Sequence, residues 1–131
     1  VSVDPAGKLF CSHGLDCVNT LIPTGVENRE HYFEGLPAKD DPLFAACYGR
    51  AEPRHSYYKT LGKKYISTYN FCLANILRKY GSDGKRIYAD LMPRRLRSWG
   101  FNTMGNWSFP ENYRNKKFPY AISLNPQRPP I

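Results

Sequence analysis

The segment 96–108 constrains the fold more than any other part of this chain, because it predicts a helix followed directly by a buried strand. The helix stops at Gly100, since a glycine just past a helix end can adopt a left-handed conformation that strains other residues. Arginines in the preceding turn would complement the negative end of the helix dipole. The residues after the glycine predict a strand over 101–108, with Asn106 and Trp107 at its carboxyl end. This pattern is typical of one αβ step in a parallel α/β fold.

Two further strands are predicted from composition. Residues 8–18 form the first strand of the fold and residues 119–124 the third, with 101–108 between them as the second. The tail, 125–131, contains three prolines. Because proline removes hydrogen-bond donors from a sheet, this tail cannot continue a central strand.

An unusually long insertion follows the first strand. Residues 19–66 are predicted to form a long loop with a short helical turn near 41–46, whereas such connections usually have about 2–6 residues. Long insertions at the carboxyl ends of strands commonly shape a ligand cleft, and Glu30 with its aromatic neighbours offers a suitable mixture of side chains. The alternative is that these aromatic residues only pin the loop to the fold.

Residues 67–99 are predicted to form two helices. The first covers 67–80 and ends at Gly81, because its apolar residues recur at helical spacing. The second begins near Ser82 or Asp83 as its cap. Pro93 lies inside this second helix and is expected to kink or divide it, since it removes an intrahelical hydrogen bond.

The cysteines indicate neither a disulfide framework nor a zinc site. Cys11 and Cys17 would lie on one face of the first strand, about 20 Å apart, and could not pair. No Cys-x-x-Cys spacing occurs. We expect all four cysteines, which include Cys47 and Cys72, to be buried thiols that pack as small apolar residues.

Charge and hydropathy limit the classes of partner. The formal net charge is +8, but the lysines and arginines form no single stripe, so we expect a solvated basic surface rather than a nucleic-acid site. No run approaches the roughly 18 apolar residues of a membrane span, and no membrane partner is predicted. The chain is 41% hydrophobic and 15% aromatic, which is enough to form at least part of a core.

An ordered series of segments resembles the start of the catalytic domain of agarase-like glycoside hydrolases, family fifty and related barrel enzymes. The segments are 10–18, 28–37, 41–42, 69–71, 78–81 and 96–108, within residues 8–124. The resemblance implies an α/β fold, a partial (β/α)8 TIM barrel with the first two to three strands. A complete barrel takes about 250 residues. Because this chain has 131, the resemblance implies that residues 1–131 are an amino-terminal fragment.

The resemblance also implies a chemistry and a set of binding residues. Enzymes of this type cleave a galactan such as agarose with retention, using two carboxylates about 5–5.5 Å apart. Both glutamates would lie beyond this chain, so we assign no catalytic residue, cofactor or metal. The expected partners are a polysaccharide or oligosaccharide and the rest of the barrel. The predicted substrate-binding residues are Asn106 and Trp107, Asp16 and His13 on the first strand, and Glu30 in the insertion.

Details of this site remain open on the sequence alone. Strand alternation places His13 and Asp16 on opposite faces, and burial in the core is the expected fate of His13. The resemblance implies a secreted or periplasmic protein, although residues 1–5 show no signal-peptide pattern. The competing interpretations are a noncatalytic module that binds carbohydrate or nucleic acid, and a structural fragment without a function of its own.

Overall fold

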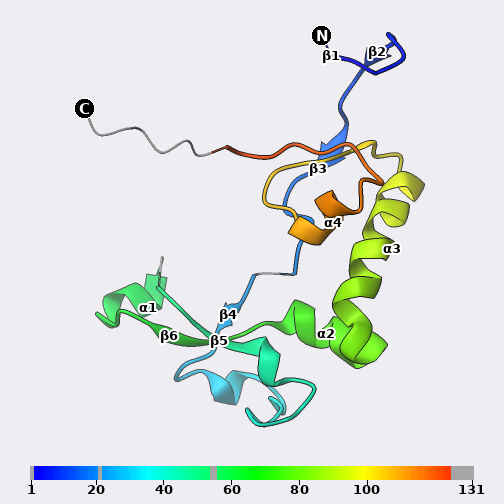
Figure 1. Cartoon of the computed structure of the whole chain (residues 1–131). Coiled ribbons are helices and arrows are strands. Elements are labelled where there is room, and N and C mark those ends of the chain that lie inside the picture. The colour runs from blue at the N-terminus through cyan, green and yellow to red at the C-terminus, as the bar shows by residue number, and fades with distance from the viewer. Residues whose placement is uncertain (1, 21, 54–55, 125–131) are drawn as a thin grey trace. The chain divides into compact units, whose positions relative to one another are not determined.

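The computed structural model describes residues 2–20, 22–53 and 56–124, which fall into two compact units (Figure 1). The discontinuous unit combines the chain up to Asn19 with the chain from Tyr88 onward. The inserted unit is the continuous segment Thr20–Ile87. The predicted tail 125–131 lies outside the described residues.

The discontinuous unit contains three parallel segments in chain order. Its elements are β1 (Ser2–Val3), β2 (Leu9–Phe10), β3 (Gly14–Leu15), most of α3 (Gly84–Ser98), β7 (Thr103–Met104) and α4 (Pro110–Arg114). Strand β3 pairs in parallel with β7, and Met104 forms a further parallel bridge with Tyr120. Helix α3 precedes β7 and α4 precedes Tyr120, so helices alternate with parallel segments.

The predicted strands are much shorter in the structure. Residues 8–18 do not form one strand: β2 pairs antiparallel with β1, whereas β3 pairs with β7. Between β2 and β3 the backbone bonds to the side chain of Asn102 instead of to a neighbouring strand. Its Oδ1 accepts a hydrogen bond from the His13 backbone N–H at 2.8 Å, and its Nδ2 donates to the Cys11 carbonyl at 2.8 Å. The other two predicted strands are reduced to β7 and to the bridge at Tyr120.

Helix α3 runs without interruption through Pro93, so the predicted division of this helix does not occur. Proline cannot donate the bond that the carbonyl four residues earlier would receive. The Nδ2 group of Asn115 donates to that carbonyl, of Ala89, at 3.2 Å. Pro93 is also fully buried, so packing supports the helix at this point. The helix ends as predicted, with Gly100 in the left-handed region at a φ of 86°.

The inserted unit is built around a small antiparallel sheet rather than a long loop. Its strands are β4 (Thr24–Gly25), β5 (Tyr48–Ala51) and β6 (Ile66–Tyr69), in the order β4-β6-β5. Its helices are the 3-10 turns η1 (Glu30–Tyr32), η2 (Ala45–Cys47) and η3 (Gly81–Asp83), with α1 (Ser56–Thr60) and α2 (Phe71–Tyr80). The turn η2 overlaps the helical turn predicted near 41–46.

Helix α2 starts later than predicted, because residues 66–69 belong to strand β6. These residues alternate β-branched and polar side chains that suit a central strand. Asn70 marks the boundary: its Oδ1 accepts the backbone N–H of Leu73 at 2.9 Å, which caps the helix. The stop at Gly81 is as predicted.

Each unit has its own buried cluster. The discontinuous unit buries Val18, Met92, Leu96, Met104 and Phe118. The inserted unit buries Val26, Cys47, Tyr69, Leu73, Ala74 and Leu77. The expectation of four buried thiols is wrong, because Cys47 is buried and the other three free cysteines are exposed. No helix in the described part of the chain is long and apolar enough to cross a membrane.

Candidate functional site

The carboxyl ends of β3 and β7 lie side by side and place Asp16, Cys17, Asn106 and Trp107 together; we call these four residues the strand-end cluster. The parallel pairing continues past the strands through backbone bonds. Gly105 N–H donates to the Leu15 carbonyl at 2.7 Å, and Cys17 N–H donates to the Asn106 carbonyl at 2.8 Å. The two turns after the strands are therefore held to each other by their backbones.

Asp16 fixes the second of these turns. Its Oδ1 accepts the Asn106 backbone N–H at 3.0 Å. Gly105 makes this approach feasible, since a Cβ at that position would lie 1.8 Å from the same oxygen. The Asp16 carboxylate therefore holds the backbone of the turn at Asn106. It can come this close because the preceding residue, Gly105, has no Cβ.

Trp107 is displayed at the surface by a strained turn. Its φ is 58°, in the left-handed region, and Cys17 on the facing turn also has a φ of 58°. Each such residue costs about 1–2 kcal/mol, so surrounding bonds must hold it. The Asn19 Nδ2 group donates to the Trp107 carbonyl at 2.5 Å. The indole is 67% exposed, which leaves a flat apolar face available to a ligand.

Asn106 contributes an amide that is only partly satisfied. Its Oδ1 is buried and has no hydrogen-bond donor among the described residues. A buried acceptor without a donor costs about 1–3 kcal/mol. The cluster therefore combines the exposed aromatic face of Trp107 with a buried amide oxygen that no described residue bonds.

Sequence reasoning missed the residues that support the cluster. The Ser108 backbone N–H donates to the Tyr113 hydroxyl at 3.0 Å, and that hydroxyl donates to the Gly105 carbonyl at 3.0 Å. The Ser108 hydroxyl accepts the Val18 N–H at 3.2 Å. These contacts join residues that are up to 90 positions apart, so no local pattern indicates them.

His13 does not join the strand-end cluster. It precedes β3, whereas Asp16 follows it, so the two residues lie at opposite ends of the strand. The expectation of a core histidine is wrong, because His13 is exposed. Its ring packs edge-on against Phe101 with centroids 4.9 Å apart. Its backbone bonds to Asn102 give it a structural environment at the amino ends of the strands.

Glu30 belongs to the inserted unit, where it begins η1 and lines a pocket of that unit. The electrostatics of this unit are shaped by burial and by the ion pair between Lys63 and Glu27. A hydrogen bond from Lys63, followed by one from the Ser67 backbone N–H, lowers the pKa of Glu27. Burial raises the pKa of the Cys47 thiol and of the Tyr48 and Tyr69 hydroxyls.

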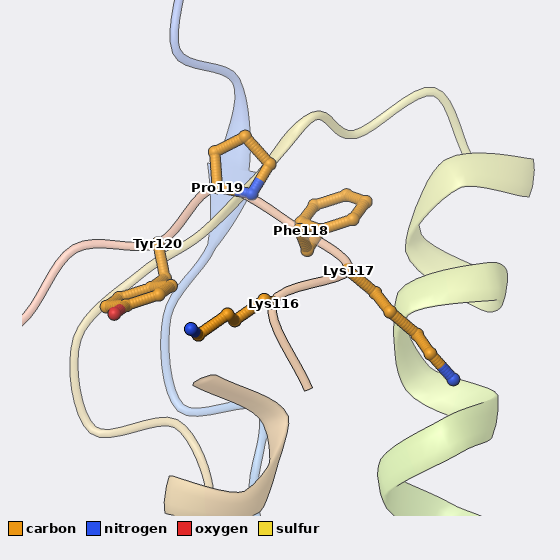
Figure 2. A pocket seen from close by; sticks show the side chains of 5 residues that line it. All are labelled: Lys116, Lys117, Phe118, Pro119 and Tyr120. Carbon is orange, nitrogen blue, oxygen red and sulfur yellow. The ribbon is translucent and has the colours of Figure 1, made fainter. Parts of the chain in front are cut away.

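A depression of about 480 Å³ is lined by residues 116–120 of the discontinuous unit (Figure 2). Lys117 extends toward α3, where its Nζ bonds to Asp90 at 2.8 Å. Tyr120 stacks on Tyr113 with centroids 4.8 Å apart. These residues lead into the third parallel segment and so lie toward its amino end, whereas ligand sites in parallel α/β sheets lie at the carboxyl ends of the strands. We therefore place the candidate site at the strand-end cluster.

Comparison with known proteins gives a consistent set of relatives. Beta-agarase B and beta-agarase A of Vibrio sp. (strain JT0107) are 34% and 31% identical to this chain, each over 92% of it. The solved structure of PfGH50B matches with a TM-score of 0.77 at 31% identity, covering 92% of this chain and 19% of that one. No family model matches. The resemblance predicted from the sequence is confirmed, and the chain spans 14% and 12% of the length of the two agarases.

Proposed function

We propose that this chain, a homologue of part of the β-agarases of glycoside hydrolase family fifty, forms the amino-terminal part of the catalytic barrel of an agarose-hydrolysing enzyme. The similarity to two β-agarases over 92% of the chain is the observation that carries the proposal. Because the chain spans a small share of each relative, the reaction belongs to the complete protein rather than to these residues alone.

The parallel segments support a barrel. Strands β3 and β7 and the bridge at Tyr120 follow one another in chain order, with α3 and α4 between them, as the first three strands of a (β/α)8 barrel would. The strand-end cluster lies where such barrels carry their active-site loops.

The cluster supports a role in substrate recognition. The exposed face of Trp107 offers an apolar surface to a pyranose ring, and the neighbouring half-buried Asn106 carries an amide N–H group that can donate to a hydroxyl. Asp16 holds the turn that carries both residues. Hydrolysis with retention would use two carboxylates about 5–5.5 Å apart, supplied by glutamates outside these residues.

The test is to read the gene beyond the codon for Ile131 and to assay the product of the complete reading frame on agarose. We expect an in-frame continuation with two glutamates at later strand ends. We also expect the protein to release oligosaccharides whose new reducing ends keep the anomeric configuration, which NMR measures. A complete reading frame whose product binds agar oligosaccharides without cleaving agarose would instead favour a noncatalytic binding module. Inverted products would overturn the retaining mechanism.

A further inference from the structure

The inserted unit contains a pocket of about 400 Å³ that the proposed reaction does not explain. Side chains from η1, the loop 36–39, β5 and β6 line it, so residues far apart in the sequence converge on one space. Its volume lies within the range of small-molecule sites, roughly 300–1,000 Å³. Val26, Leu36 and Pro37 supply apolar surface, and the ring of Tyr48 supplies an aromatic one.

The aromatic part of this pocket is held by the core. The Tyr48 hydroxyl donates to the Pro37 carbonyl at 2.5 Å, and burial raises its pKa, so the donor is retained at neutral pH. The ring packs edge-on against Tyr69 with centroids 4.7 Å apart, and Tyr69 is 1% exposed. The pocket is therefore formed before any ligand arrives, which lowers the entropy cost of binding.

The pocket is lined by one acidic and one basic side chain, which do not form an ion pair with each other. Glu30 and Lys39 both line it, and neither has an ion-pair partner among the residues that the structure describes. The Lys39 ammonium lies 6.0 Å from the centroid of the Tyr48 ring. The pocket thus offers acceptors on one side chain and donors on another, with no net charge.

This combination favours a neutral ligand over one that carries a single charge. An anionic or cationic ligand would meet one favourable and one unfavourable charge. A neutral sugar satisfies both, because each hydroxyl can donate to Glu30 or accept from Lys39 while the ring lies on apolar surface. We propose that the inserted unit carries a second saccharide-binding pocket, formed by Glu30, Lys39 and Tyr48, for neutral units of the galactan. This inference rests on the proposed function for the identity of the sugar.

The test uses the product of the complete reading frame and a thio-linked, non-hydrolysable analogue of an agarose hexasaccharide in isothermal titration calorimetry. The variant Glu30→Ala/Lys39→Ala removes both charged groups of the pocket, and both side chains are exposed, so the substitutions leave the buried core unchanged. The matched control, Glu34→Ala/Lys59→Ala, removes the same charges from exposed positions outside the pocket lining. We expect the pocket variant to lose one binding equivalent, or to weaken it by about tenfold or more, while the control binds as the unchanged protein does.

Two further measurements, the salt dependence of binding and the hydrolysis of agarose, distinguish failure of the pocket from failure of the proposed function. Binding to a neutral sugar should change little with ionic strength, whereas strong weakening by salt would overturn the neutral-ligand assignment. If the unchanged protein hydrolyses agarose but the pocket variant binds the analogue with the same stoichiometry and affinity, the second pocket is refuted and the proposed function stands. If an equivalent that depends on Glu30 and Lys39 is found without hydrolysis, the pocket stands and the proposed function fails. Absence of any binding refutes the pocket.

Discussion

Replacing Gly105 with alanine tests whether Asp16 fixes the turn that carries Asn106 and Trp107. An added Cβ would lie 1.8 Å from Oδ1 and 2.9 Å from Cγ of Asp16, so the carboxylate would have to move away. The φ of Gly105 lies outside the left-handed region, so alanine adds this clash without backbone strain. The substitution therefore acts mainly through the hydrogen bond that Asp16 makes.

The size of the effect follows from that bond. Moving the carboxylate breaks the 3.0 Å bond from the Asn106 N–H to Oδ1. A hydrogen bond to a charged group contributes about 1.5–3 kcal/mol, and the exposure of Asp16 places this one near the lower end. Asp16→Ala removes the same bond and also the two nearest clashing atoms, and leaves the Cα of residue 16 at 3.2 Å from the added Cβ. Gly105→Ala should then cost little in the Asp16→Ala background, with a coupling free energy of about 1 kcal/mol or more.

Urea unfolding of the 131-residue chain, followed by tryptophan fluorescence, measures the four free energies of this double-mutant cycle. Gly49→Ala is the matched control, because its Cβ would have no closer neighbour than the Thr68 hydroxyl at 3.3 Å. We expect that control to change stability by well under 1 kcal/mol. Costs that add within about 0.5 kcal/mol in the double variant would refute the positioning role of Asp16.

Three further predictions concern other parts of the chain. Asn115→Ala should destabilise the chain by about 1 kcal/mol, and by less in a Pro93→Ala background where the helix regains its own donor; a double-mutant cycle by urea unfolding measures this. The pKa of Glu27 is lowered in the folded state, so the ionised carboxylate stabilises the fold above its ordinary pKa. This stabilisation is lost as the pH falls through the pKa of the folded state. In Glu27→Gln, the unfolding midpoint should therefore fall less between neutral and acidic pH than in the unchanged chain. Burial raises the pKa of Cys47 and shields it, so thiol labelling should modify the other three cysteines first, and equal labelling rates for all four would contradict this.

The features predicted correctly from the sequence are those with local causes. Gly100 ends α3 and Gly81 ends α2 because a glycine can take the left-handed position after a helix, whatever the rest of the chain does. Asn106 and Trp107 follow β7 for a similar reason, since the strand and the turn are adjacent in the sequence. Signals of this kind need no knowledge of distant contacts.

The features that differ from the sequence-based predictions depend on hydrogen-bond partners far away in the sequence. Pro93 lies in an unbroken helix because Asn115 bonds to a carbonyl 26 positions away in sequence. The strand predicted over 8–18 is divided because the Asn102 side chain, about ninety positions on, bonds to the backbone at Cys11 and His13. The sheet of the inserted unit pairs β4 with β6 across most of the insertion. No local propensity indicates which of these partners is present.

The geometry of the strand-end cluster also limits what these residues can do chemically. A retaining glycosidase uses two carboxylates about 5–5.5 Å apart, and Asp16 is the acidic residue of the cluster. One of its oxygens already accepts the Asn106 N–H and supports a turn with a left-handed tryptophan. If Asp16 moved to serve a reaction, it would release the residues proposed to bind the sugar. The cluster is therefore suited to recognition, and a substitution at Asp16 should raise KM together with any loss of kcat, rather than abolish turnover as loss of a nucleophile would.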